Sequence, residues 1–168
     1  GYCRKIIKRD DGFAILGTGG SDDEATLVKV DERGGLIWSI VYDDPRLWEP
    51  LDLIQIEDDG FLLFGYSQPP PYATLVKTDA QGNEEWRKKY DDYIGGGKGW
   101  IHKTEDGGYF MVSGYAVTKL DSECEVEWNA AAPFGFEKYF NNGMVSGINH
   151  DMKKIDGGAV FIGYGAED

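Results

Sequence analysis

The segment DDGFLLFG (58–65), followed by LVKTDAQG (75–82) and Trp86, recurs along the chain and decides the fold. The other copies read DDGFAILG (10–17) with LVKVDERG (27–34), and DGGYFMVSG (106–114) with VTKLDSEC (117–124). A fourth copy begins with DGGAVFIG (156–163). Gly12, Gly60 and Gly108 lie 48 residues apart, and a fixed period in this range indicates an array of stacked units that share their apolar faces.

The apolar run in each copy is continuous, without alternation: FAIL (13–16), FLLF (61–64), YFMV (109–112) and AVFI (159–162). A strand of this kind is apolar on both faces and needs cover on both. In the second copy we expect strands at 51–57, 61–66, 73–79 and 84–90. The pattern therefore predicts a stack of small four-stranded antiparallel sheets.

A tight turn joins the last two strands of each predicted unit. Asp31, Asp79 and Asp121 begin these turns, and Gly34 and Gly82 end them at a position that favours a positive φ. Cys124 takes the glycine position in the third copy, where a Cβ costs about 1 kcal/mol if the backbone is unchanged. Trp38, Trp86 and Trp128 follow seven residues after each Asp, and we expect the rings to lie between neighbouring sheets.

The composition restricts the function. A net charge of −13 disfavours binding to nucleic acid or to anionic lipid, and it fits either solubility or divalent-cation binding. No apolar stretch approaches the length of a membrane span. Cys3 and Cys124 allow one disulfide without requiring it.

Two sets of side chains are candidate sites. The acids Asp43, Asp44, Asp91 and Asp92 follow the tryptophan in the first two copies and predict a calcium site, with ordinary strand-end turns as the alternative. Aromatic residues in or near the connections between units predict a surface for carbohydrate or protein, unless they only cover the sheet ends. This second set comprises Trp48, Tyr93, Trp100, Phe136 and Tyr139.

The pattern Lys-x-Asp-x-x-Gly-x-x-x-Trp resembles the tryptophan-docking repeats of quinoprotein-type (PQQ-like) β-propellers, with Lys for the usual Ala and a turn shorter by one residue. The chain also resembles the DGGY…LVKLD…W repeats of secreted proteins. The first resemblance implies a β-propeller fold in a group that includes cofactor-dependent dehydrogenases and structural scaffolds. The second implies an extracellular or cell-surface location.

The predicted fold is thus all-β: a β-propeller-type array of four-stranded antiparallel blades, about three and a half in this chain. The repeats span approximately residues 4–50, 51–98, 99–145 and 146–168 of one domain. Propellers close with roughly four to eight blades. The array could belong to a longer ring, form a shortened four-bladed ring, or pair with a second copy in a seven-bladed ring.

Three functions fit these expectations. The first is a non-catalytic binding or scaffold module, with calcium as the one candidate cofactor and protein or carbohydrate as the partner. The second is part of an enzyme, a hydrolase or quinoprotein-like, whose central-channel site further blades complete. The third is a structural repeat of a surface layer.

Overall fold

The computed structural model describes residues 1–19, 24–43, 47–67, 72–94, 99–113, 116–131, 150–154 and 160–164. These residues form strands and turns without a helix, which confirms the all-β prediction for the described part of the chain. Accordingly, no helix in that part is long and apolar enough to cross a membrane.

The strands form three four-stranded antiparallel sheets and one strand pair. The first sheet contains β1 (Cys3–Arg9), β2 (Gly12–Gly19), β3 (Glu24–Val30) and β4 (Leu36–Tyr42). The second contains β5 (Leu47–Gln55), β6 (Phe61–Ser67), β7 (Tyr72–Thr78) and β8 (Glu84–Ile94). The third contains β9 (Gly99–Lys103), β10 (Tyr109–Ser113), β11 (Ala116–Leu120) and β12 (Val126–Ala131). The strand pair is β13 (His150–Lys154) and β14 (Val160–Tyr164).

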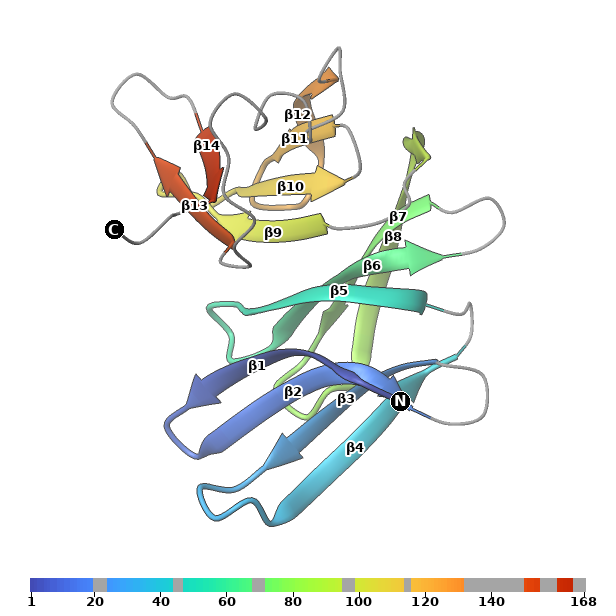
Figure 1. Ribbon diagram of the computed structural model, residues 1–168, viewed down its shortest axis with the longest axis vertical. Helices are drawn as coiled ribbons and strands as arrows, with labels where there is room; N and C mark the ends of the chain where they lie inside the picture. The colour runs from blue at the N-terminus through green and yellow to red at the C-terminus, as the bar shows by residue number, and fades with distance from the viewer. Residues whose placement is uncertain are drawn as a thin grey trace.

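Within each sheet the strands lie side by side in chain order, as expected for strands joined by tight turns. Figure 1 shows the second sheet between the first and the third. The leading strands of the sheets contact one another, β1 with β5 and β5 with β9. No closed sheet is found among the described strands.

A bulge in the last strand fixes the position of the tryptophan in each sheet. Lys29 lies opposite Trp38, Lys77 opposite Trp86, and Lys119 opposite Trp128, and the register shifts directly after each lysine. Because a bulge adds one residue to one strand, it changes which side chains share a face. Each lysine and tryptophan therefore lie on the same face of their sheet.

The turns beginning at Asp31, Asp79 and Asp121 share one geometry. In each, the aspartate Oδ1 accepts two backbone N–H groups at 2.7 to 2.9 Å, from the second and fourth residues after it. Gly34 and Gly82 have φ values of 82° and 83°. Cys124 has a φ of 59°, so the third turn keeps the backbone and accepts the strain of a side chain there.

Two apolar cores separate the three sheets. One lies between the first and second sheets and includes Leu16, Leu27, Phe61 and Leu63. The other lies between the second and third sheets, where Phe64 and Met111 are among the buried side chains. The second sheet is therefore covered on both faces, and every residue of β6 is buried.

The first sheet is covered on one face only. In β2, buried and half-buried residues alternate along the strand, although its sequence closely resembles that of β6. The prediction that each apolar run is covered on both faces is therefore wrong for β2. The reason is that the described residues place a neighbouring sheet on one side of the first sheet alone.

Both cysteines are free: Cys3 is exposed and Cys124 is buried. The disulfide that the composition allows is not formed. Burial raises the pKa of the Cys124 thiol to about 12, so this group stays protonated at neutral pH.

Candidate functional site

The boundary between the first and second sheets is built from a tryptophan and a turn glycine. The Trp38 ring lies edge-on to Phe61, with 6.2 Å between the ring centroids. A Cβ atom at Gly82 would lie 2.8 Å from Cη2 of Trp38, so only glycine fits beneath the indole. At the next boundary, Trp86 packs against the core between the second and third sheets.

Trp128 is less well covered than the other two indoles. The residue is 46% exposed, and its ring contacts Phe110 of its own sheet with 5.8 Å between the ring centroids. The prediction that all three rings lie between sheets is therefore wrong for Trp128. Trp38 and Trp86 each pack against the core shared with the following sheet, and Trp128 has no such cover over almost half of its surface.

A tyrosine joins the same turns at both boundaries. The Tyr42 hydroxyl donates to the Gly82 carbonyl at 2.7 Å, and the Tyr90 hydroxyl donates to the Cys124 carbonyl at 2.8 Å. Burial raises the pKa of both hydroxyls, which remain donors. Sequence reasoning missed these contacts, although the signal is a tyrosine four residues after the tryptophan in both copies.

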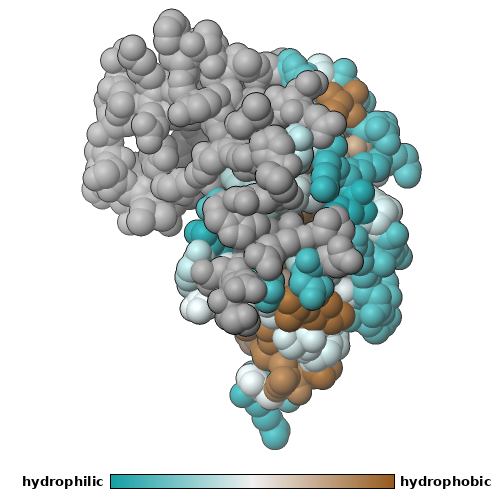
Figure 2. Space-filling model, turned by 90° about the vertical axis from the view of Figure 1, so that its right-hand side faces the viewer, coloured by the Kyte–Doolittle hydropathy of each residue, from teal (hydrophilic) through white to brown (hydrophobic). Residues whose placement is uncertain are grey.

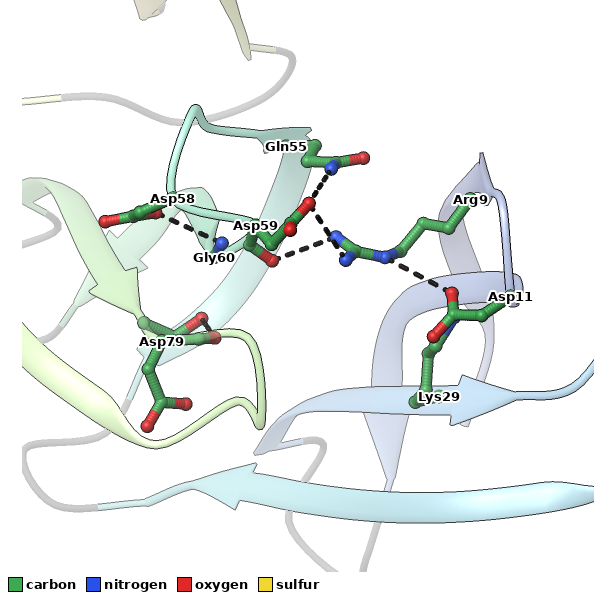
Figure 3. A network of polar contacts seen from close by, with 9 residues as sticks. Arg9, Asp11, Lys29, Gln55, Asp58, Asp59, Gly60 and Asp79 are labelled. Carbon is green, nitrogen blue, oxygen red and sulfur yellow. Dashed lines mark hydrogen bonds and ion pairs between the residues drawn. The ribbon is translucent and has the colours of Figure 1, made fainter.

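Arg9 crosses the first boundary among charged side chains (Figure 3). Its Nη1 donates to the Asp59 carbonyl at 2.9 Å, and Nη2 lies 3.4 Å from Asp59 Oδ1. The guanidinium also lies over the Phe61 ring, 5.0 Å from its centroid. Since the Arg9 side chain is only 10% exposed, these contacts hold it against the second sheet.

Each strand lysine pairs with a carboxylate at the turn after the first strand of its sheet. Lys29 pairs with Asp11, Lys77 with Asp58 at 2.8 Å, and Lys119 with Asp106 at 3.0 Å. The hydrogen bond from Lys77 lowers the pKa of Asp58, and the corresponding bonds raise the pKa of Lys77. Both partners therefore remain charged at neutral pH, which suits ion pairing better than proton transfer.

Asp52 is a buried carboxylate that joins three consecutive sheets. Its side chain is 6% exposed, and its oxygens lie 2.9 Å from Lys5 Nζ and 3.1 Å from the backbone N of Ile101, which donates to it. Arg4 and Glu49 form a second pair between β1 and β5, at 3.6 Å. This ionic group therefore lies along the leading strands.

The structure describes only part of the predicted aromatic surface. Trp48 lies in β5 and Tyr93 in β8, and their side chains are outside the description. Trp100 is half-buried in β9, opposite Val112 of β10. Phe136 and Tyr139 lie outside the described residues. The aromatic surface stays a prediction.

The predicted calcium ligands are described in part as well. Asp43 is exposed directly after β4, and Asp44 lies outside the described residues. Asp91 and Asp92 lie in β8, where the register shifts between Tyr90 and Ile94. Within the described ranges, no three acidic, histidine or cysteine side chains gather as a metal site. Calcium binding stays a prediction.

Comparison with known proteins identifies similarity in fold alone. No protein-family model matches the sequence, and no curated protein matches it. The chain is similar to a crystal structure of a protein of unknown function from Bacteroides caccae, with a TM-score of 0.52 and 11% identity. The match covers 79% of this chain and 47% of that protein, so the chain spans less than half of its length.

Proposed function

We propose that the chain is a non-catalytic binding or scaffold module built as a β-propeller-type array. The observation that carries the proposal is the recurrence of one contact at both sheet boundaries: a tyrosine of one sheet donates to the turn carbonyl of the next. A contact that recurs in register can be extended by further units of the same kind.

Two further observations support a propeller-type arrangement. The leading strands β1, β5 and β9 contact one another across the boundaries, as the inner strands of adjacent blades do. The match covers 47% of the Bacteroides caccae protein, so a chain with a similar fold can be longer than this one. Kinship with the PQQ-like repeats is part of the same proposal.

The ionisable groups at the sheet ends are poorly suited to acid–base catalysis. The hydrogen bond from Lys29 lowers the pKa of Asp11, while hydrogen bonds from Thr104 and then Lys119 lower that of Asp106 to about 2. A general acid or base works best with a pKa near the working pH, and these groups are shifted away from it. Their ion pairs instead stabilise the turns.

The proposed partner is a carbohydrate or a protein outside the cell or at its surface. The aromatic residues near the connections supply flat apolar surface for such a partner. The charge of −13 disfavours nucleic acid.

A glycan array tests this proposal. Trp48→Ala with Tyr93→Ala is expected to abolish glycan binding, and Tyr2→Ala, which removes an exposed aromatic residue at the start of the chain, serves as the control. If the chain binds no glycan on the array, the proposed partner is a protein. Turnover of a glycoside, ester or alcohol by the purified chain would overturn the non-catalytic proposal.

Asp52 favours a second candidate, part of an enzyme with a central-channel site. A buried carboxylate beside Lys5, whose side chain is 42% exposed, lies on the leading strands that line the centre of a propeller. In that case Lys5→Met abolishes turnover while the chain remains folded. Since further blades complete such a site, the candidate is rejected if a protein that contains them shows no turnover with these substrates.

A further inference from the structure

The first sheet exposes an apolar face. Large apolar side chains there are substantially exposed: Ile6 at 56%, Leu36 at 68%, Ile37 at 52% and Val41 at 44%. Figure 2 shows an apolar area at the lower end of the molecule, where the first sheet lies. We call the surface formed by Ile6, Phe13, Ile15, Val28, Leu36 and Val41 the outer face.

The outer face corresponds to a surface that is covered in the second sheet. At a spacing of 48 residues, Phe13 is equivalent to Phe61, Ile15 to Leu63, and Val28 to Val76. Phe61, Leu63 and Val76 are buried in the core that the first sheet shares with the second. The outer face therefore has the apolar character of a surface that takes another sheet.

The last strand makes the outer face more apolar than its covered counterpart. Leu36 and Val41 correspond to Glu84 and Lys89 at the same spacing of 48 residues. Exposed contiguous apolar surface of this kind indicates a contact with another molecule or segment. Glu84 and Lys89 are exposed in the second sheet, so Leu36 and Val41 extend the apolar outer face beyond the part that is covered there.

The turn that contains Gly34 in the first sheet is equivalent to the turn that receives an indole in the second sheet. Gly82 receives Trp38, whose ring would lie 2.8 Å from an added Cβ. The equivalent Gly34 has the same positive φ, and nothing lies within 4 Å of an added Cβ. The position that takes an indole in the second sheet is open in the first.

The third sheet exposes a tryptophan of the kind that packs on such a turn. Trp128, on β12, is 46% exposed. Trp128 stands in its sheet as Trp38 stands in the first, opposite the strand lysine. One chain therefore exposes both an open turn glycine and a tryptophan of the type that such a glycine receives.

We infer that a second copy of this chain docks on the outer face, with Trp128 of one copy against the Gly34 turn of the other. Such a contact joins two different surfaces, so it generates a closed ring or an open chain of copies. The inference rests on the sheet-to-sheet contact and not on the ligand binding proposed above. Since each copy carries a charge of −13, added salt strengthens the association.

Sedimentation equilibrium over a range of concentrations tests the inference. Wild type is expected to exceed 18.7 kDa as its concentration rises. Ile15→Glu places a charge on the outer face at the position equivalent to Leu63, which is buried against the first sheet, and it should weaken association at least tenfold. Trp128→Ala should do the same. Asn129→Asp adds the same charge at the next residue of β12, which points to the opposite face, and should leave association unchanged.

Mixing the two weakened variants distinguishes this contact from a symmetric one. Ile15→Glu retains a normal Trp128, and Trp128→Ala retains a normal outer face, so together they should form a dimer of one copy of each. A contact between two outer faces would not be restored by mixing. A mass of 18.7 kDa at every concentration, or association that neither variant weakens, overturns the inference. Glycan binding by such a monomer would leave the proposed function standing.

Discussion

The second sheet and the first have nearly the same sequence pattern and different surroundings. FLLF in β6 is buried throughout, whereas FAIL in β2 alternates between buried and half-buried. The second sheet lies between two others, and the first has one described neighbour. The pattern of a strand thus shows that it can be covered on both faces, while the neighbouring sheets decide whether it is.

The same comparison extends to the turns. Gly82 and Gly34 have nearly the same φ, but an indole lies against Gly82 alone. Equivalent residues in the two sheets therefore form matched pairs. In each pair the residue type is the same, and only the packing of a neighbouring sheet against it differs. Substitutions in these pairs measure the contribution of the neighbouring sheet.

The largest difference is expected for the two phenylalanines at equivalent positions. Phe61→Ala removes a fully buried ring and should lower the free energy of unfolding by about 4 kcal/mol. Phe13→Ala removes a half-buried ring and should cost about 1 to 2 kcal/mol. Urea unfolding at a concentration where the chain is monomeric measures both. Equal losses would show that the outer face is covered in solution even in the monomer.

A smaller difference is expected for the turn glycines. Gly82→Ala combines an unfavourable positive φ with a clash against Trp38 and should cost about 3 kcal/mol. Gly34→Ala has the same φ and open space around the new Cβ, so it should cost about 1 kcal/mol. Thermal unfolding of the two variants provides the measurement. If Gly34→Ala were the more destabilising, the two turns would not be equivalent.

The buried tyrosine hydroxyls should contribute less. Tyr42→Phe leaves the Gly82 carbonyl without its buried donor and should cost about 1 to 2 kcal/mol. Tyr90→Phe should behave in the same way at the second boundary. Tyr2→Phe, at an exposed ring, is the control and should have little effect. A negligible loss in Tyr42→Phe would mean that the hydroxyl does not hold the sheets together.

Local sequence signals were sufficient for the strands and turns. Glycine and aspartate at fixed spacing predicted the turn geometry, because the positive φ and the two accepted amides are properties of a few adjacent residues. Even Cys124 keeps this geometry, since the rest of its turn is unchanged.

Contacts between sheets were harder to predict. Tyr42 precedes the acids Asp43 and Asp44 in the sequence, whereas its hydroxyl reaches a turn 40 residues away. Asp52 gave no signal at all, because its partners Lys5 and Ile101 come from two other sheets. Trp128 has the same local pattern as Trp38, and only the presence of a covering sheet separates them. Such pairings depend on how units stack, which no single unit encodes.

The lysine–carboxylate pairs should respond to pH without regard to the neighbouring sheets, because both partners belong to one sheet. The pKa of Asp106 is about 2 in the folded chain, against 3.8 in the unfolded chain. Between these values the unfolded chain binds more protons, so stability rises with pH in this window and the contribution of Asp106 is lost below it. Asp106→Asn should flatten this part of the stability profile in acid unfolding experiments. Glu32→Gln, which changes an exposed carboxylate in the turn after β3, should leave the slope as steep as in the wild type. An unchanged slope in Asp106→Asn would show that the hydrogen bonds from Thr104 and Lys119 to Asp106 do not persist in solution.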